Sequence, residues 1–271
     1  MKKTKTILFL LCLCASVATL AQSDSSFQLI GSIKGEFSWF NVDNLNNIYV
    51  FTNTNQLKKI DEKGDSIAVF NDVKRYGNPF SVDVANPLKI LLYYKNFSTV
   101  VILDRLLTVR NTINFRNQNI FSVKAIATSY DNNIWLFDEQ DYKLKKIDEI
   151  GKSLQETTDW RSLFDSVPSP TKLIDRDNLV YLYDPEKGFY IFDYYSGFKN
   201  KLPFLNWTDV EVSGRNMYGF NNKTLYSYEL NSLVLKEYKL PAFFGNYLGI
   251  KAMNGKVYLN KGDRIDIYQV K

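Results

Sequence analysis

Short apolar runs separated by turn residues recur along most of the chain. A cluster of Asp, Asn or Gly leads into an apolar residue and then an aromatic residue or leucine, as in Asp43–Val50 and Asp131–Leu136. The aromatic or leucine position falls at Tyr49, Leu91, Trp135, Tyr181, Tyr218 and Tyr258, in steps of 42, 44, 46, 37 and 40 residues. A period of this length indicates six copies of one repeat.

A second landmark follows each of these positions by ten to twelve residues. It pairs an apolar or aromatic residue with an acid or amide: Ile60-Asp61, Leu103-Asp104, Ile147-Asp148, Phe192-Asp193, Tyr228-Glu229 and Tyr268-Gln269. Because the carboxylates Asp61, Asp104, Asp148 and Asp193 come once per repeat, we interpret them as structural rather than as a catalytic pair.

Each repeat has room for four short strands. In the third repeat they are predicted at Val123–Ser129, Ile134–Phe137, Lys143–Ile147 and Leu154–Trp160, with turn residues between them. Units of about 40 residues with four strands are typical of propeller blades, whose sheets bury their faces by stacking on their neighbours. The sequence therefore predicts an all-β fold, a six-bladed β-propeller, with Ile48, Ile90, Ile134, Val180, Met217 and Val257 in the blade core.

The two ends of the repeat region complement each other. The last repeat, Tyr247–Lys271, contains only three strands, whereas Phe27–Ile33 reads as an extra strand before the first repeat begins near Phe37. Pairing that strand into the last blade would close the ring and remove two open sheet edges. Seven blades would need a longer chain.

The N-terminus predicts export. Lysines in Met1–Thr6 precede the apolar run Ile7–Ala18 and the small residue Ala21, so we expect a signal peptide over residues 1–21 and a single propeller domain over 22–271. Cys12 and Cys14 lie inside the signal and do not follow small residues, which disfavours lipidation. Cleavage leaves no transmembrane segment and no cysteine. We expect a location in the periplasm, at the outer membrane or outside the cell.

Composition narrows the chemistry. Loss of the three signal lysines lowers the formal charge from +5 to +2, so charge gives no reason to expect nucleic acid as a partner. The chain has no histidine, which excludes His-based nucleophilic triads, His-ligated metals and the commonest general base. No catalytic motif is found, and we expect no catalytic residues and no required cofactor.

A calcium site built from oxygen ligands is compatible with acids and amides near the inner-strand ends: Asp43, Asp83, Asp131, Asp177 and Asn216. The structural alternative is that tight turns favour Asp and Asn there, because their side chains bond to local backbone.

Aromatic and arginine side chains gather in the loops that join one predicted blade to the next. Trp, Tyr and Arg supply most hot spots of binding surfaces, so this enrichment predicts a face that binds a protein partner or a glycan. The predicted binding residues are Arg75, Tyr76, Arg116, Phe121, Trp160, Arg161, Phe164, Trp207, Phe243, Phe244 and Tyr247. The alternative is that some loop rings, Phe80, Trp160 and Phe204 first among them, fill gaps between blades.

The repeat pattern also resembles a known family. Asn46–Val50, followed by Gln56-Leu57 and Lys59–Gly64, resembles the NHL-type repeat of six-bladed propellers over Ser25–Lys271. The Ala-Gln junction and the richness in Asn, Lys and Tyr resemble exported proteins of Bacteroidota. The resemblance implies architecture and says little about activity, because such propellers include scaffolds, sensors and enzymes.

Three functions remain from this sequence, the last of them a purely structural module whose partner depends on its operon context. The first is a non-enzymatic binding or scaffolding propeller of the bacterial cell envelope that holds a protein partner. The alternative is a carbohydrate-binding protein or a His-independent glycan lyase, with Tyr or Lys as base and an Asp-ligated calcium ion.

Overall fold

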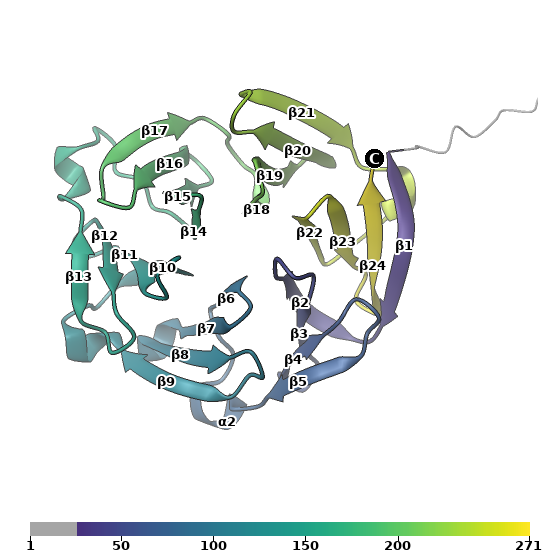
Figure 1. The fold of residues 1–271 in the computed structure, drawn as a ribbon, viewed down its shortest axis with the longest axis horizontal. Coiled ribbons are helices and arrows are strands. Elements are labelled where there is room, and N and C mark those ends of the chain that lie inside the picture. Colours follow the sequence, from purple (N-terminus) through teal and green to yellow (C-terminus); the bar gives the residue numbers. More distant parts are fainter. Residues whose placement is uncertain (1–25) are drawn as a thin grey trace, which may run out of the picture.

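The fold is known from a computed structural model that describes residues 26–271, so the predicted signal peptide with Cys12 and Cys14 lies outside the described residues. Six antiparallel sheets of four strands each stand in a ring around a common centre (Figure 1). The chain is an all-β, six-bladed β-propeller, as the repeat predicted.

The first three blades follow one another along the chain. Blade 1 contains β2 (Phe37–Val42), β3 (Ile48–Thr52), β4 (Leu57–Ile60) and β5 (Ser66–Phe70). Blade 2 contains β6 (Ser81–Asn86), β7 (Lys89–Tyr94), β8 (Thr99–Asp104) and β9 (Val109–Asn114). Blade 3 contains β10 (Val123–Thr128), β11 (Ile134–Asp138), β12 (Lys143–Ile147) and β13 (Ser153–Glu156).

The remaining blades complete the ring. Blade 4 contains β14 (Lys172–Arg176), β15 (Leu179–Asp184), β16 (Gly188–Asp193) and β17 (Phe198–Leu202). Blade 5 contains β18 (Thr208–Ser213), β19 (Asn216–Asn221), β20 (Thr224–Glu229) and β21 (Val234–Lys239). Blade 6 contains β22 (Gly249–Met253), β23 (Lys256–Asn260), β24 (Arg264–Val270) and β1 (Phe27–Lys34).

Short helices occupy the connections. They are α2 (Val73–Tyr76), η2 (Lys95–Phe97), η3 (Phe115–Gln118), η4 (Trp160–Ser162) and η5 (Ala242–Phe244). All except η2 lie between the last strand of one blade and the first strand of the next.

The N-terminal strand closes the ring, which confirms the prediction from the two ends of the repeat region. β1 pairs antiparallel with β24, from Phe27 opposite Val270 to Lys34 opposite Arg264, and the two strands lie side by side in Figure 1. β1 becomes the outer strand of blade 6, and β24 is paired on both sides, with β23 and with β1.

The outer strand of blade 3 is shorter than predicted, because β13 ends at Glu156 and not at Trp160. The carboxylate of Asp159 accepts the backbone N–H of Arg161 and caps η4 at that point. Trp160 thereby leaves the sheet and turns into the space between blades 3 and 4.

The predicted blade core is confirmed. The six repeat positions Ile48, Ile90, Ile134, Val180, Met217 and Val257 are all fully buried. Hydrophobic clusters join neighbouring blades: one contains Trp135 of blade 3, Val180 of blade 4 and Trp160 from the loop between them. Stacking of blades therefore supplies the burial that a single four-stranded sheet lacks.

The repeated aspartates hold the turns between the third and fourth strands. The Asp148 carboxylate accepts the backbone N–H groups of Ile150 at 3.0 Å and Lys152 at 2.8 Å. In their own turns, Asp61, Asp104 and Asp193 likewise accept the backbone N–H groups two and four residues further along the chain. This geometry is that of the structural role predicted for them.

Candidate binding site

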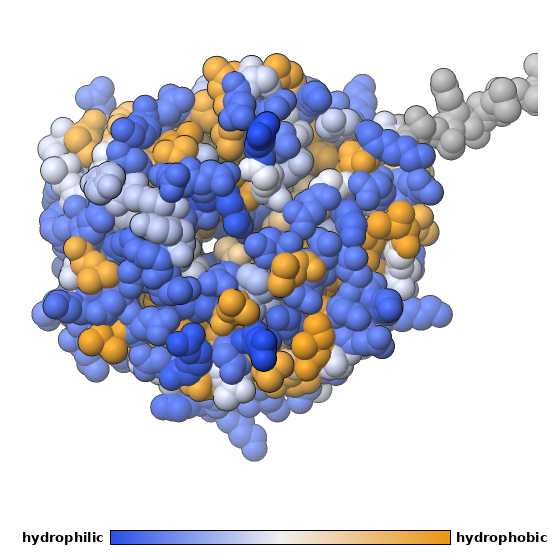
Figure 2. Space-filling view, viewed as in Figure 1, coloured by the Kyte–Doolittle hydropathy of each residue, from blue (hydrophilic) through white to orange (hydrophobic). Residues whose placement is uncertain are grey.

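The two ends of the inner strands define two faces of the ring. The face with the connections between blades is called the loop face here. The face with the turns between the first and second strands of each blade is called the turn face. In the view of Figure 2 the surface is mainly hydrophilic, with hydrophobic side chains in separate groups. In this view the hydrophobic side chains do not form one continuous patch.

Three of the eleven predicted binding residues are buried between blades. Trp160, Trp207 and Phe244 pack in the clusters that join blades 3 and 4, 4 and 5, and 5 and 6. The alternative raised for Trp160, filling a gap between blades, therefore describes all three. Trp207 also lines a cavity of about 330 Å³, together with Thr208 and Lys251.

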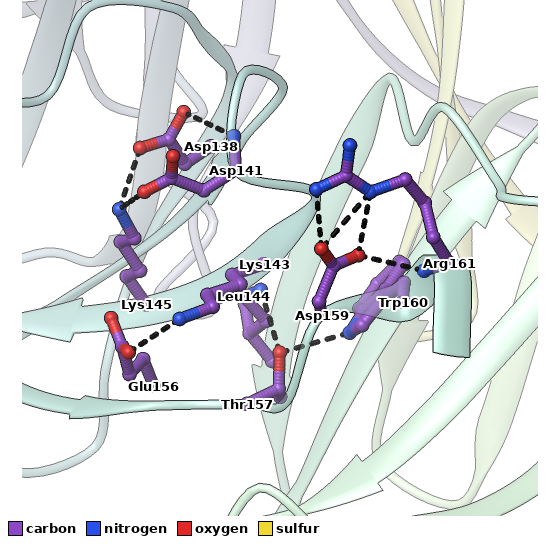
Figure 3. A network of polar contacts seen from close by, with 10 residues as sticks. All are labelled: Asp138, Asp141, Lys143, Leu144, Lys145, Glu156, Thr157, Asp159, Trp160 and Arg161. Atoms are coloured by element: carbon purple, nitrogen blue, oxygen red, sulfur yellow. Dashed lines mark hydrogen bonds and ion pairs between the residues drawn. The ribbon is translucent and has the colours of Figure 1, made fainter. Parts of the chain in front are cut away.

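Trp160 shows how such a ring is held. It is 0 % exposed, stacks on Phe192 at 5.1 Å between ring centroids, and donates its indole N–H to the Thr157 hydroxyl at 2.9 Å. In Figure 3 the side chain of the neighbouring Arg161 points away from Trp160. Its guanidinium donates hydrogen bonds to the Asp159 carboxylate. In this loop, Trp160 is buried between the blades, whereas Arg161 is exposed and pairs with Asp159.

The other predicted residues reach the surface in separate loops. Arg75, Arg116, Phe121, Arg161 and Phe243 are exposed, and Tyr76, Phe164 and Tyr247 are half-buried. In the described chain, ring and cation–π contacts join the predicted residues only within a loop: Arg75 to Tyr76, Trp160 to Phe164, and Phe243 to Phe244. The structure does not gather the eleven residues into one surface.

One part of the loop face does form a hollow, between blades 1 and 2. Two cavities of about 180 and 300 Å³ adjoin there and share Asn78 and Phe80. Together they are called the aromatic groove, which is lined by the rings of Trp39, Phe51, Tyr76, Phe80, Tyr94 and Phe97.

Four segments bring these rings together. Trp39 lies on β2 and Phe51 on β3, and their ring centroids are 5.4 Å apart. Tyr76 ends α2 and contacts both Tyr94, at 4.9 Å, and Phe97 of η2, at 5.8 Å. The groove is therefore built by strands of both blades together with the connection between them and η2.

Phe80 stands between the two cavities. Its backbone N–H donates to the Tyr93 carbonyl at 2.7 Å, which continues the β6–β7 pairing by one residue, and its ring meets Tyr93 edge to face at 6.0 Å. Phe80 is nevertheless 55 % exposed and Phe97 48 %. Gap filling between blades was the alternative considered for Phe80, but its ring lines the groove.

Polar groups alternate with the rings. Asn55, Asn78 and Asn96 supply amides, Ser81 lines the smaller cavity with a buried hydroxyl that lacks a partner, and Lys95 places its ammonium 5.0 Å from the Phe80 ring centre. Among the described residues that line the groove, none is a carboxylate. The groove can stack on apolar groups, bond to amides or hydroxyls, and attract negative charge.

The sequence indicated part of this site. Arg75 and Tyr76 were predicted from their loop. The guanidinium carbon of Arg75 lies 5.0 Å from the centre of the Tyr76 ring, at the edge of the groove. Trp39 and Phe51 were missed because they lie on strands, and Phe97 because it lies in a turn within a blade. The missed signal was the triplet of large rings in Tyr93-Tyr94-Lys95-Asn96-Phe97, interrupted by only two polar residues.

The acids considered for calcium bond mainly to the protein itself. Asp43 accepts the backbone N–H groups of Leu45 and Asn47, Asp83 accepts that of Thr128, and Asp131 pairs with Lys146. Within residues 26–271, no three His, Cys, Asp or Glu side chains gather in a way that could hold a metal ion.

No helix in residues 26–271 has the length and apolar character needed to cross a membrane. No protein-family model matches the chain, and no curated protein matches it in sequence.

Solved structures do resemble it. The WD40 domain of Pan2 from Neurospora crassa gives a TM-score of 0.62 at 10% identity, covering 91% of this chain and 96% of that one. A Bacteroides fragilis protein whose name describes it as exported gives 0.60 at 12%, covering 93% and 98%. Inactive virginiamycin B lyase from Staphylococcus aureus with quinupristin gives 0.57 at 11%, covering 90% and 100%. At these identities the likeness concerns the propeller fold alone.

Proposed function

We propose that this protein is an exported, non-enzymatic propeller that binds a protein partner through the aromatic groove. One observation carries the proposal: six aromatic rings from two blades line adjoining cavities, with Phe80 and Phe97 about half exposed. Exposed aromatic rings beside a preformed hollow are the usual anchors of protein interfaces.

The groove favours a particular kind of partner segment. The phenylalanine rings carry no polar group and can pack against apolar side chains of a partner. The amides of Asn55, Asn78 and Asn96 can form hydrogen bonds with an extended backbone. Lys95 within the groove and Arg75 at its edge favour a carboxylate nearby. We infer a segment with one or two aromatic or aliphatic anchors flanked by an acidic residue.

The absence of histidine from the whole chain supports a binding role over catalysis. The described lining of the groove contains no carboxylate that could act as a general base. We propose stacking and hydrogen bonding as its chemistry.

The compartment is part of the proposal. The signal-peptide pattern over residues 1–21 supports export, and the NHL-like repeat and Ala-Gln junction support an envelope protein of Bacteroidota type. We propose a periplasmic or outer-membrane-associated location, where a partner of the envelope is available.

Selection from a displayed library of random peptides tests the partner chemistry directly. Immobilised residues 22–271 should enrich peptides with an aromatic or aliphatic anchor next to Asp or Glu. Binding of an enriched peptide, measured by calorimetry, should weaken at least tenfold in the double variant Phe80→Ala/Phe97→Ala, because truncating an anchor ring costs roughly 2 kcal/mol or more.

The control is the double variant Phe121→Ala/Phe243→Ala. These rings are 54 % and 57 % exposed on the same face, which matches Phe80 and Phe97 in residue type and exposure. Equal loss of binding in both double variants, or enrichment of peptides without apolar anchors, would refute the groove as the site. If binding depends on Phe80 and Phe97 alone, photo-crosslinking from position 97 in native envelope would identify the natural partner.

A further inference from the structure

A second pocket lies on the turn face, at the end of the ring opposite the aromatic groove. It has a volume of about 300 Å³ and is lined by residues at the ends of the strands β6, β10 and β14. These are the inner strands of their blades in Figure 1. Four blades contribute to it, from Asn44 of blade 1 to Asp177 of blade 4. This hollow is called the axial pocket, and its size is at the lower end of small-molecule sites, about 300–1,000 Å³.

Two polar atoms in the lining lack partners. Thr128 is 4 % exposed, yet its hydroxyl is buried without a hydrogen bond, and the same holds for the Nε–H of Arg176. An unsatisfied buried polar atom costs about 1–3 kcal/mol. A ligand that both donates to and accepts from the protein would supply the missing bonds.

A fixed aromatic platform stands at the same pocket. The rings of Tyr130 and Tyr194 stack at 4.2 Å with an angle of 6° between their planes, and Tyr130 is largely exposed. The Tyr194 hydroxyl donates to the Asp175 carboxylate at 2.8 Å, which holds the pair in place. A platform of this kind offers a flat apolar surface beside the polar atoms.

The buried carboxylate of the pocket, Asp175, is already bonded to protein donors. The Asp175 carboxylate also accepts the Trp135 indole N–H at 2.9 Å and the Ser129 hydroxyl at 3.1 Å. Burial raises the pKa of Asp175 against the effect of these donors. Both carboxylate oxygens of Asp175 are already bonded to protein donors. Arg176 and Asp177, next to each other in the lining, carry opposite charges.

A cation of the protein already lies near these rings. The Lys146 ammonium lies 5.1 to 5.9 Å from the ring centres of Tyr130, Trp135 and Tyr194, and it pairs with Asp131. A cationic ligand would have to compete with this lysine. An anion would meet Asp175 and Asp177.

We propose that the axial pocket binds a neutral saccharide, with one sugar ring on the Tyr130 platform and its hydroxyls bonded to Thr128 and Arg176. Sugar hydroxyls both donate and accept, and the C–H face of a sugar ring suits an aromatic surface. The site is independent of the aromatic groove.

The four tryptophan indole groups provide the test, because each gives its own N–H signal in a ¹H–¹⁵N spectrum. Trp135 reports on the axial pocket through its bond to Asp175, and Trp39 reports on the aromatic groove. The probes are neutral disaccharides of glucose, galactose, mannose and N-acetylglucosamine at millimolar concentration, with spermidine and citrate as charged comparisons.

At least one disaccharide should shift the Trp135 signal and leave Trp39 unchanged. Tyr130→Ala should weaken that binding at least tenfold, whereas Leu88→Ala should not, since Leu88 is exposed to a similar extent on the turn face and is not among the pocket-lining residues. No shift of Trp135 by any disaccharide would overturn the proposal. So would a shift of Trp39 instead, or equal binding of spermidine or citrate.

Discussion

Replacing Trp160 by alanine tests whether the loop aromatics between blades serve packing or recognition. The side chain is fully buried against Phe137, Tyr190 and Phe192, and its N–H is bonded to Thr157. Truncating a buried aromatic ring to alanine costs about 3–5 kcal/mol, since the lost contacts leave a cavity. We expect the upper part of that range, because Trp160 also bridges two blades.

Urea unfolding followed by far-UV circular dichroism measures this loss. With a denaturant slope of about 2–3 kcal/mol/M, the midpoint should fall by roughly 1–2 M. Arg161→Ala is the matched control, because it removes an exposed side chain from the next position of the same loop and should leave the midpoint nearly unchanged.

Peptide binding gives the second readout. Trp160→Ala should retain the affinity of the aromatic groove at temperatures where it is folded, because the groove lies between blades 1 and 2 and Trp160 lies between blades 3 and 4. A variant with unchanged stability and lost binding would refute the packing role and return Trp160 to the binding surface.

Two further predictions concern turns and charge. Asp148→Ala should lower the free energy of unfolding by about 1–2 kcal/mol, measured by urea titration, because two backbone N–H groups lose their acceptor; Asp148→Asn should retain most of it. Burial alone would raise the pKa of Asp131, but hydrogen bonds, first that from Lys146, lower it below its usual value. Its contribution to stability is therefore present above the ordinary Asp pKa and lost as pH falls through the lowered one, so Asp131→Asn should show a smaller acid-induced drop in the urea midpoint.

The fold followed from the sequence because its causes are local and repeated. Every blade carries its own buried position and four of the six carry a turn aspartate, as at Asp104 and Ile90 or Asp148 and Ile134, so weak signals from six repeats reinforce one another. The outer strand of blade 3 was predicted too long because Trp160 has the strand propensity of an aromatic residue. Its inward turn depends on the Asp159 cap and on space between two blades.

The binding site could be predicted only in part. Loop aromatics look alike in sequence, whether they fill a gap like Phe244 or face solvent like Phe243, its direct neighbour. The difference is set by which side of a short helix faces the adjacent blade. Likewise, Trp39 and Phe97 lie 58 positions apart on different blades, and only the ring geometry places them at one groove.

The pairing of β1 with β24 also determines at which point of synthesis the ring can close. A ribosome or an export channel delivers Phe27–Lys34 first, and its partner Arg264–Val270 emerges only after all the intervening blades. The nascent chain must therefore carry an unmatched strand throughout its synthesis, and the contact that seals the ring is among the most distant in sequence, which slows folding. A product cut short before residue 264 would lack β24, so β1 would have no partner strand.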